Sequence, residues 1–398
     1  MAKSKTKVVS DGTTEHEFTN DLIKSINATL KETKAYNLQN DESPTEVKRF
    51  ISTGSLLLDY IISNKKHGGI PEGRLVEISG PESSSKSLIA LQILANTQKL
   101  GGIAIYLDTE NATDKLLLTS LGIDLDKLVY IQPTYIEEVF QIIEHTIKKI
   151  KESGTDKPVT VVWDSVAATP PKAELDGDYE QNTMGLGARV IAKGLRKITQ
   201  FIAENRVTLV FINQLKMKIG VTMYEDPWIT PYGKAIPFHA SVRLRLTRKK
   251  SSDVIDPDTK EYLGIGVKAK VDKNKIAPPY RSCEYTVGFY KGILEHEQIF
   301  NALVTLSPIE LEIDKKKYLF TADNGAWHKV IIEAQNASSN NLIHELKFRK
   351  SDILTVVFKN EEIAKYLDSA IDDILTREYS KQEEASIDDV TEAINADI

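Results

Sequence analysis

Between residues 50 and 290, continuous apolar runs alternate with segments of helical periodicity. Runs rich in Val, Ile and Leu predict buried strands at Arg74–Ser79, Ile103–Asp108, Val159–Asp164 and Val207–Asn213. The apolar positions between them predict helices over 86–100, 112–121, 135–152 and 184–205. Uninterrupted apolar strands separated by helices are typical of a mostly parallel sheet covered on both faces. The pattern therefore predicts an α/β fold.

The flanking segments have a different pattern. Apolar residues repeat at helical spacing from Glu15 to Tyr36, which predicts an N-terminal helix that packs on a neighbouring subunit or on its own core. Further strands are expected at Ser241–Thr247, Gly264–Val271 and Ser282–Phe289, and mixed helices and short strands follow Gly292. The predicted domains are an N-terminal helix and linker at 1–49, a central α/β core at 50–290, a small α+β domain at 291–380 and an acidic tail at 381–398.

Composition narrows the class of protein. The 398 residues are 41% hydrophobic and 27% charged, with a net charge of −6, so any nucleic-acid contact must rest on local basic patches. The single cysteine, Cys283, excludes an internal disulfide. The first 21 residues lack the apolar stretch of a secretory signal, and no apolar run approaches the roughly 18–20 residues of a membrane helix. We expect a cytosolic protein with no membrane contact.

One loop carries the most specific chemical signal. It lies between the strand ending at Ser79 and the helix beginning near Leu88, where backbone N–H groups and the helix dipole converge on an anion. Lys86 is expected to bind the β- and γ-phosphates of ATP and the Ser87 hydroxyl to bind Mg²⁺. Ser85 occupies a position where glycine is usual, and a serine-rich turn without function is the alternative. The predicted ATP-binding residues of the loop are Gly80, Pro81, Glu82, Ser83, Ser84, Ser85, Lys86 and Ser87.

Polar residues at the ends of other strands complete the predicted site. Asp164 ends an apolar strand and is a candidate Mg²⁺ ligand, although it could instead cap the following helix. Glu110 is the preferred candidate for the base that activates water, with Asp108 as its rival. Gln214 follows another strand and could sense the γ-phosphate, or serve only in a turn.

Two long irregular segments point to DNA. They are predicted at Glu174–Thr183 and Lys216–Phe238, and the second interleaves lysines with Tyr224, Trp228 and Tyr232. Basic and aromatic residues together suit phosphate contact and base stacking on a single strand, although a protein-binding loop would look similar. Alternating basic residues over 243–250 and 268–275 predict a phosphate track on one strand face, with a merely solvated strand as the alternative.

Several strings resemble one family. They are ISTGS at Ile51–Ser55, GRLVEI at Gly73–Ile78, GPESS at Gly80–Ser84, MGLGAR at Met184–Arg189, FINQLKMKIG at Phe211–Gly220 and KNKIA at Lys273–Ala277. Together they resemble the bacterial RecA recombinases, almost without gaps from about Phe50 to Phe289. The resemblance implies a phosphate-loop ATPase core and an ATP-dependent filament on single-stranded DNA that pairs it with a homologous duplex.

The resemblance also implies roles for individual residues. Glu110 would be the catalytic base, Gln214 the γ-phosphate sensor, and Asp114 part of the ATP site. Lys273 and Lys275 would reach the ATP of a neighbouring subunit, and Phe238 would lie at that interface. Residues implied at single-stranded DNA are Met184 and Ile219, inserted between bases, and Arg189, Arg196, Lys216 and Lys218 on the backbone, to which the loop composition adds Trp228. Those implied at the duplex-binding surface are Arg243, Arg248, Lys268 and Lys270.

The sequence departs from the family pattern at several points. Ser85 replaces a glycine, and Leu117 stands where the family has an aromatic residue that stacks on adenine. These departures indicate a divergent version, of the kind that a phage or mobile element encodes. Two alternatives remain: a hexameric helicase on the same fold, and a filament-forming regulatory DNA-binding protein with weak ATPase activity, which Ser85 and Leu117 support.

Overall fold

The computed structural model describes most of the chain, in two compact units, Met1–Lys48 and Arg49–Ile398. The described residues are 15–39, 46–178, 185–218, 220, 228–256, 258–335 and 340–376. Met184, Ile219, Tyr224 and the predicted acidic tail lie outside them. Within the described residues, no helix has both the length and the apolar character needed to cross a bilayer.

In the described part of the first unit, residues 15–39 and 46–48, the helix is α1 (Glu15–Leu30). It ends at Leu30 because Lys31 adopts a left-handed backbone conformation, with φ of 54°. The Asn27 side-chain oxygen then accepts hydrogen bonds from the backbone N–H groups of Lys34 and Ala35, each at 2.8 Å. The helix carries exposed apolar side chains at helical spacing, namely Phe18, Leu22, Ile26 and Leu30.

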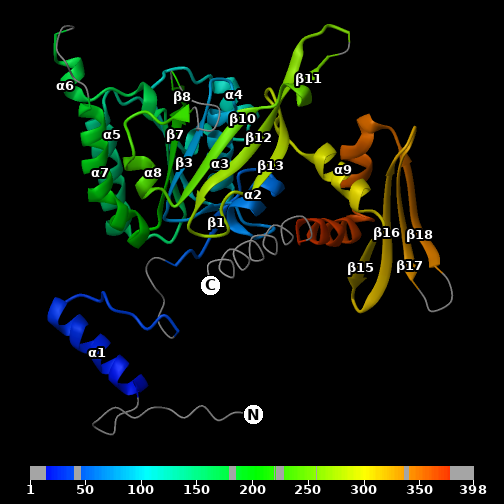
Figure 1. The fold of residues 1–398 in the computed structure, drawn as a ribbon, viewed down its shortest axis with the longest axis horizontal. Coiled ribbons are helices and arrows are strands. Elements are labelled where there is room, and N and C mark those ends of the chain that lie inside the picture. The colour runs from blue at the N-terminus through cyan, green and yellow to red at the C-terminus, as the bar shows by residue number, and fades with distance from the viewer. Residues whose placement is uncertain are drawn as a thin grey trace. The chain divides into compact units, whose positions relative to one another are not determined.

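A large mixed sheet forms the centre of the second unit (Figure 1). Its strand order is β14-β13-β12-β10-β3-β7-β6-β4-β5, with β11 paired to β12. Strands β10, β3, β7, β6, β4 and β5 run parallel, whereas β12, β13 and β14 continue the sheet as antiparallel strands. The bounds are β3 (Leu75–Gly80), β4 (Ile103–Asp108), β5 (Leu128–Ile131), β6 (Val159–Asp164), β7 (Val207–Gln214), β10 (Val242–Arg248), β11 (Val254–Ile255), β12 (Tyr262–Asn274), β13 (Ser282–Gly288) and β14 (Gly292–Leu294).

Helices cover both faces of this sheet (Figure 1). One face packs on α2 and α3, and the other on α5 and α7. The described residues of the core form the helices α2 (Leu56–Ser63), α3 (Lys86–Lys99), α4 (Lys115–Ser120), α5 (Ile136–Ser153), α6 (Lys172–Leu175), α7 (Leu186–Glu204) and α8 (Ala235–His239). Smaller pairs of strands are β1 (Phe50–Ile51) with β2 (Ile70–Pro71), and β8 (Lys216–Met217) with β9 (Trp228–Ile229).

The sequence explains the tight packing beneath α5 and α7. All six residues of β6 are buried, and the Trp163 ring meets Phe140 and Phe211 edge to face at centroid distances of 6.0 and 5.0 Å. Gly194 lets the Phe140 ring lie against α7, because a β-carbon at residue 194 would come within 2.5 Å of that ring. These contacts pack β6 and β7 closely against α5 and α7.

A smaller α+β region follows the core. It comprises α9 (His296–Leu306), a second sheet and a final helical segment, 364–376. The sheet has the order β15-β16-β17-β18, with bounds β15 (Ile309–Ile313), β16 (Lys316–Asn324), β17 (His328–Gln335) and β18 (Asn340–Phe348). Glu295, at its start, caps α2 of the core: its carboxylate accepts hydrogen bonds from the Leu56 and Leu57 N–H groups and the Ser55 hydroxyl.

The structure confirms the predicted fold class, an α/β core with a mostly parallel sheet, an N-terminal helix and a small α+β region. Several elements of the core are not predicted by the sequence pattern, among them α2, β5 and the short strands β1, β2 and β11. The prediction of an irregular Lys216–Phe238 segment is wrong in part, because its described residues include β8, β9 and α8. Likewise, α6 begins before and enters the predicted irregular segment Glu174–Thr183.

Candidate functional site

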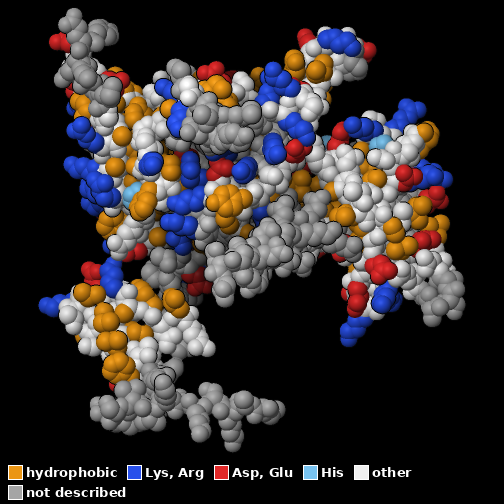
Figure 2. Space-filling model, in the orientation of Figure 1, with side chains coloured by type: hydrophobic (Ala, Val, Ile, Leu, Met, Phe, Trp, Pro, Cys, Tyr) orange, Lys and Arg blue, Asp and Glu red, His pale blue; other side chains and the backbone are white. Residues whose placement is uncertain are grey.

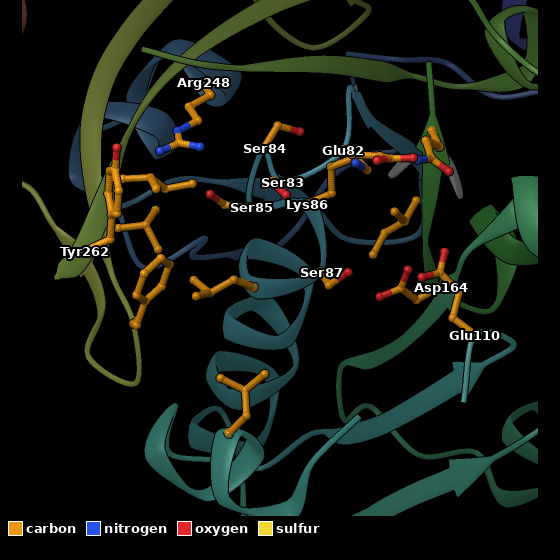
Figure 3. A pocket seen from close by; sticks show the side chains of 17 residues that line it. Glu82, Ser83, Ser84, Ser85, Lys86, Ser87, Glu110, Asp164, Arg248 and Tyr262 are labelled. Atoms are coloured by element: carbon orange, nitrogen blue, oxygen red, sulfur yellow. The ribbon is translucent and has the colours of Figure 1, made fainter. Parts of the chain in front are cut away.

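A cavity of about 700 Å³ opens at the carboxyl ends of β3, β4, β6 and β7 (Figure 3). Ligands bind in such crevices in open α/β sheets. The cavity brings together predicted residues from distant parts of the chain, namely Glu82, Ser83, Ser84, Ser85, Lys86, Ser87, Glu110, Asp164 and Gln214. The other lining residues are Leu88, Leu117, Ile212, Arg248, Tyr262, Ile265, Val287 and Phe289.

The phosphate loop joins β3 to α3 as the sequence predicts. Gly80 is needed at its start, because a β-carbon there would lie 2.4 Å from the carbonyl oxygen of Leu246 on β10. Ser85 caps α3 with a left-handed backbone, φ 68°, which explains why glycine is usual at this position. That conformation costs a non-glycine residue roughly 1–2 kcal/mol. The Ser85 hydroxyl oxygen is buried and has no hydrogen-bond partner among the described residues.

Lys86 lies at the centre of the cavity (Figure 3). Its Nζ donates a hydrogen bond to the carbonyl oxygen of Pro81 at 2.7 Å. Burial lowers the pKa of Lys86, and the nearby carboxylates of Asp164, Glu110 and Glu82 oppose that shift. The ammonium group is thus held within the loop, where a bound phosphate would meet it.

The Asp164 carboxyl faces the start of α3. The Ser87 side chain points toward it (Figure 3), and the Tyr106 hydroxyl donates a hydrogen bond to Asp164 Oδ2 at 3.0 Å. Burial raises the pKa of Asp164 to about 6, although the hydrogen bonds from Ser87 and Tyr106 oppose this. A hydroxyl and one carboxylate are hard oxygen donors that fit Mg²⁺, which proteins hold through one or two carboxylates and the phosphates of the substrate.

The geometry distinguishes Glu110 from Asp108. Asp108 is buried, and its Oδ1 accepts the backbone N–H groups of Glu110 and Asn111 at 3.1 and 2.9 Å. Its Oδ2 accepts the Tyr130 hydroxyl at 2.9 Å. Glu110 instead lines the cavity and accepts a hydrogen bond from the Ser165 hydroxyl at 2.5 Å. The structure therefore places Asp108 beneath the site, where it holds the turn that presents Glu110.

Of the polar residues at the end of β7 and after β4, some line the cavity and others only stabilise the local structure. Gln214 lines the cavity, and its Nε2 donates to Glu82 Oε1 at 2.8 Å. Its neighbour Asn213 is buried and donates to Glu77 Oε1 at 3.1 Å. Asp114 does not line the cavity; its carboxylate caps α4 by accepting the Leu116 N–H at 3.2 Å.

Four of the residues predicted at single-stranded DNA are exposed, and Trp228 is half-buried. Lys216 and Lys218 are exposed at and just after β8, where Met217 pairs with Trp228 of β9. On α7, Arg189 and Arg196 are both exposed, and their spacing of seven places them on one side of the helix.

A basic cluster lies near α8. The pKa of His239 is lowered by burial and by the charges of Arg196, Lys275 and Lys273. Lys273 Nζ donates to the carbonyl oxygens of Pro237 and Phe238 at 2.7 and 2.9 Å. Figure 2 shows lysine and arginine side chains gathered over α7 and α8.

The four residues predicted at the duplex-binding surface do not share one face. Lys268 and Lys270 are exposed and, by register, lie on the same face as Arg243. Arg243 is tied to the fully buried Glu77, with Nε 2.6 Å from Oε2. Arg248 lines the cavity on the opposite face.

Comparison with known proteins agrees with this geometry. A family model described as the RecA N-terminal domain matches residues 19–294. The chain belongs to the RecA family. Protein RecA of Wolinella succinogenes is 41% identical over 269 residues, which are 68% of this chain and 73% of that protein. Protein RecA of Helicobacter pylori is 38% identical over 329 residues, covering 81% of this chain and 88% of that protein. The function of the chain is that of a RecA recombinase, in recombination and repair.

Sequence reasoning missed one end of this RecA-type cavity. Tyr262, Ile265, Val287 and Phe289 come from β12 and from the end of β13, far from the phosphate loop in sequence. The available signal was weak: Ile265, Val287 and Phe289 are apolar positions of the predicted strands Gly264–Val271 and Ser282–Phe289, and Tyr262 precedes the first of them, without any motif that links these residues to a nucleotide. Ser165 and Tyr130, which donate hydrogen bonds to Glu110 and Asp108, were also missed, because no local motif links either of them to the site.

Proposed function

We propose that this RecA-family chain hydrolyses ATP when it is bound to single-stranded DNA, and that it polymerises into a filament which pairs that strand with a homologous duplex. The observation that carries the proposal is the convergence of Lys86, Ser87, Glu110 and Asp164 on one cavity beside the amino terminus of α3. A helix terminus, a lysine, a hydroxyl and two carboxylates form the set that phosphoryl transfer to water requires.

Each of these residues has a proposed role. Lys86 and the loop N–H groups bind the β- and γ-phosphates, while Ser87 and Asp164 hold Mg²⁺. When bound, Mg²⁺ neutralises charge on the phosphates. Glu110 orients the attacking water and accepts its proton. Its position is supported by the Ser165 hydroxyl and by the Asp108 carboxylate behind the turn.

Gln214 is proposed to couple the nucleotide to DNA. Its hydrogen bond to Glu82 links the end of β7 to the phosphate loop. The chain immediately after it carries Lys216 and Lys218, and it pairs through β8 with Trp228 of β9. A γ-phosphate that draws Gln214 toward it would shift these residues, which are proposed to bind single-stranded DNA.

Further surfaces complete the proposed assembly. Single-stranded DNA is assigned to Arg189, Arg196, Met184 and Ile219 as well as to the β8–β9 segment, and duplex DNA to Arg243, Lys268 and Lys270. The ion pair with Glu77 leaves Arg243 the weakest of these candidates. We assign the filament interface to α1, Phe238, Lys273 and Lys275, of which the two lysines would reach the ATP of the adjacent subunit.

Hydrolysis of ATP by the purified full-length chain, measured with and without single-stranded DNA, tests the proposal. We expect Mg²⁺-dependent hydrolysis that rises on addition of single-stranded DNA, together with strand exchange between a circular single strand and a linear duplex. DNA binding without stimulated hydrolysis would contradict the proposal and favour a regulatory filament protein. Unwinding of a forked duplex without strand exchange would favour a helicase.

A further inference from the structure

Arg248 is the last residue of β10, and its side chain lies on the opposite face from Lys268 and Lys270. Across β10 and β12, Arg248 pairs with Val267, whereas Lys268 pairs with Thr247. Side chains alternate between the two faces of a strand, so Arg248 cannot share the basic face. It lines the nucleotide cavity together with the phosphate loop (Figure 3).

The guanidinium is held by a dedicated set of contacts. Its Nη2 donates to Asp253 Oδ2 at 2.7 Å, and its Nε lies 3.4 Å from Oδ1. The backbone N–H of Gly266 donates to the same Oδ1 at 3.1 Å, and the Asp253 side chain is only 3% exposed. The Arg248 Cζ also lies 5.4 Å from the centre of the Tyr262 ring. The arginine is therefore fixed on one side while 31% of its side chain stays exposed toward the cavity.

Gly266 makes this support possible. The short 3-10 turn Lys250–Ser252 packs directly on β12 and delivers Asp253 to the arginine. A β-carbon on residue 266 would lie 2.5 Å from the Ser252 β-carbon and 2.6 Å from the Lys249 carbonyl oxygen. Only glycine permits so close an approach, which is evidence independent of the ion pair that the local structure is adapted to position Arg248.

The position of Arg248 in the cavity identifies the part of the nucleotide that it would meet. In Figure 3, Ser87, Asp164 and Glu110 lie on one side of Lys86, and Arg248 and Tyr262 lie on the other. Apolar side chains of Leu117, Ile265, Val287 and Phe289 line the cavity as well. A nucleotide whose γ-phosphate lies near Asp164 would direct its sugar and base toward Arg248.

We propose that Arg248 is a nucleotide-binding residue that contacts the nucleoside end of ATP, and that Asp253 and Tyr262 position it. A guanidinium has five N–H donors, more than the contacts with Asp253 and Tyr262 occupy, and its planar face can also stack on a base. The inference rests on the proposed nucleotide site, and it removes Arg248 from the duplex-binding surface that the family resemblance implied.

Calorimetric titration of the DNA-free chain with ADP and Mg²⁺ tests this assignment. We expect Arg248→Ala to weaken ADP binding about tenfold, because it removes the guanidinium donors at the nucleoside end. Arg248→Lys keeps the charge but loses the planar fork, and Asp253→Asn keeps the arginine but loosens it, so each should weaken binding about threefold. Inorganic tripolyphosphate, which has no nucleoside, should bind Arg248→Ala and the wild type equally.

Lys249→Ala provides the matched control. Lys249 is the next residue in the chain and is also ion-paired, in its case with Glu284, but it does not line the cavity. The ADP affinity of Lys249→Ala should therefore equal that of the wild type. Unchanged ADP affinity in both Arg248→Ala and Arg248→Lys would overturn the inference, as would an equal loss of tripolyphosphate binding or a loss confined to duplex DNA. A wild type that does not bind ADP would instead overturn the proposed nucleotide site, so the two failures are distinguishable.

Discussion

The two ends of the nucleotide cavity are built in different ways. The phosphate end uses a continuous loop, Glu82–Ser87, and side chains at the carboxyl ends of neighbouring parallel strands. The nucleoside end is assembled from α4, β10, β12 and the end of β13, which span residues 117 to 289. Backbone N–H groups and a helix terminus recognise phosphate in any such loop, whereas recognition of a nucleoside depends on the side chains that the fold brings together.

This difference explains where the chain departs from its family. Leu117 lines the nucleoside end, where the family resemblance implies an aromatic residue, and the proposed contact of Arg248 offers a different means of holding the nucleotide. At the phosphate end the one departure, Ser85, keeps the left-handed backbone that the loop requires. We therefore expect the phosphate end to depend mainly on its backbone conformation, and the nucleoside end on its side chains.

The largest effect is expected at the phosphate end from Lys86→Ala. The substitution removes a charge from the cavity and no core contact, so the chain should fold while ATP turnover falls by about 10²–10³, the loss typical of one removed transition-state donor. Steady-state hydrolysis with saturating single-stranded DNA measures this. Lys99→Ala, at the other end of α3, is the control and should hydrolyse normally. Turnover within a fewfold of the wild type would contradict the assigned role of Lys86.

A smaller effect at the same end should appear as pH dependence. Burial raises the pKa of Asp164 to about 6, so below that pH the carboxyl holds a proton that Mg²⁺ must displace. Apparent Mg²⁺ affinity should therefore fall about tenfold per pH unit below pH 6 and level off above pH 7. Titration of hydrolysis with Mg²⁺ between pH 5 and 8 measures it.

The nucleotide itself also titrates in this range, so Asp164→Asn is the necessary control. This variant has no carboxyl proton to lose and should bind Mg²⁺ more weakly, with only the pH dependence that the nucleotide contributes. An equally steep dependence in Asp164→Asn would show that the carboxyl of Asp164 does not compete for the proton.

The sequence predicted the phosphate end of the cavity, where the chemistry is local, better than the parts of the fold that depend on distant residues. Strands β3, β4, β6 and β7 were predicted because each is a continuous apolar run, and the loop after β3 because its chemistry is local. The elements α2 and β5 were missed: β5 has only four residues and is not fully buried, and α2 is a single short apolar run without a polar face. The hydrogen bonds between Glu295 and the start of α2 join residues about 240 positions apart. No local pattern in the sequence predicts such a contact.

The site was predicted only where residues act near the loop or at strand ends. Sequence spacing gave both Glu110 and Asp108 as candidates for the base. In the structure, Asp108 accepts hydrogen bonds from the Glu110 N–H and from the Tyr130 hydroxyl, so it supports the turn that carries Glu110. The family resemblance grouped Arg248 with Arg243, although their spacing of five residues in one strand already places them on opposite faces, and their ion-pair partners also differ. Partners of this kind are tertiary contacts, and no pattern along one strand contains them.

At the nucleoside end, Leu117→Tyr should restore part of the aromatic contact. An aromatic ring against the base contributes about 0.5–1.5 kcal/mol beyond its buried area, so ADP affinity should rise by about fivefold. Titration with ADP measures the change, and tripolyphosphate binding should not move. Leu116→Tyr, one residue earlier on the exposed side of α4, is the control. A weaker affinity in Leu117→Tyr would mean that the cavity wall has no room for the ring.

The smallest effect is expected from Ser85→Gly at the phosphate end. The left-handed backbone of Ser85 costs roughly 1–2 kcal/mol, but a glycine loses more conformational entropy on folding, about 0.5–1 kcal/mol, so the net gain in stability should be only about 0.5 kcal/mol.

Ser84 provides a control for which the opposite sign is expected, since it is buried, its hydroxyl donates to the Pro81 carbonyl oxygen at 2.8 Å, and its φ is not positive. Ser84→Gly should therefore destabilise the chain by about 1 kcal/mol or more. Urea unfolding of the nucleotide-free chain measures both free energies. A loss of stability in Ser85→Gly as large as that in Ser84→Gly would show that the buried Ser85 hydroxyl stabilises the loop, so that the phosphate end depends on this side chain after all.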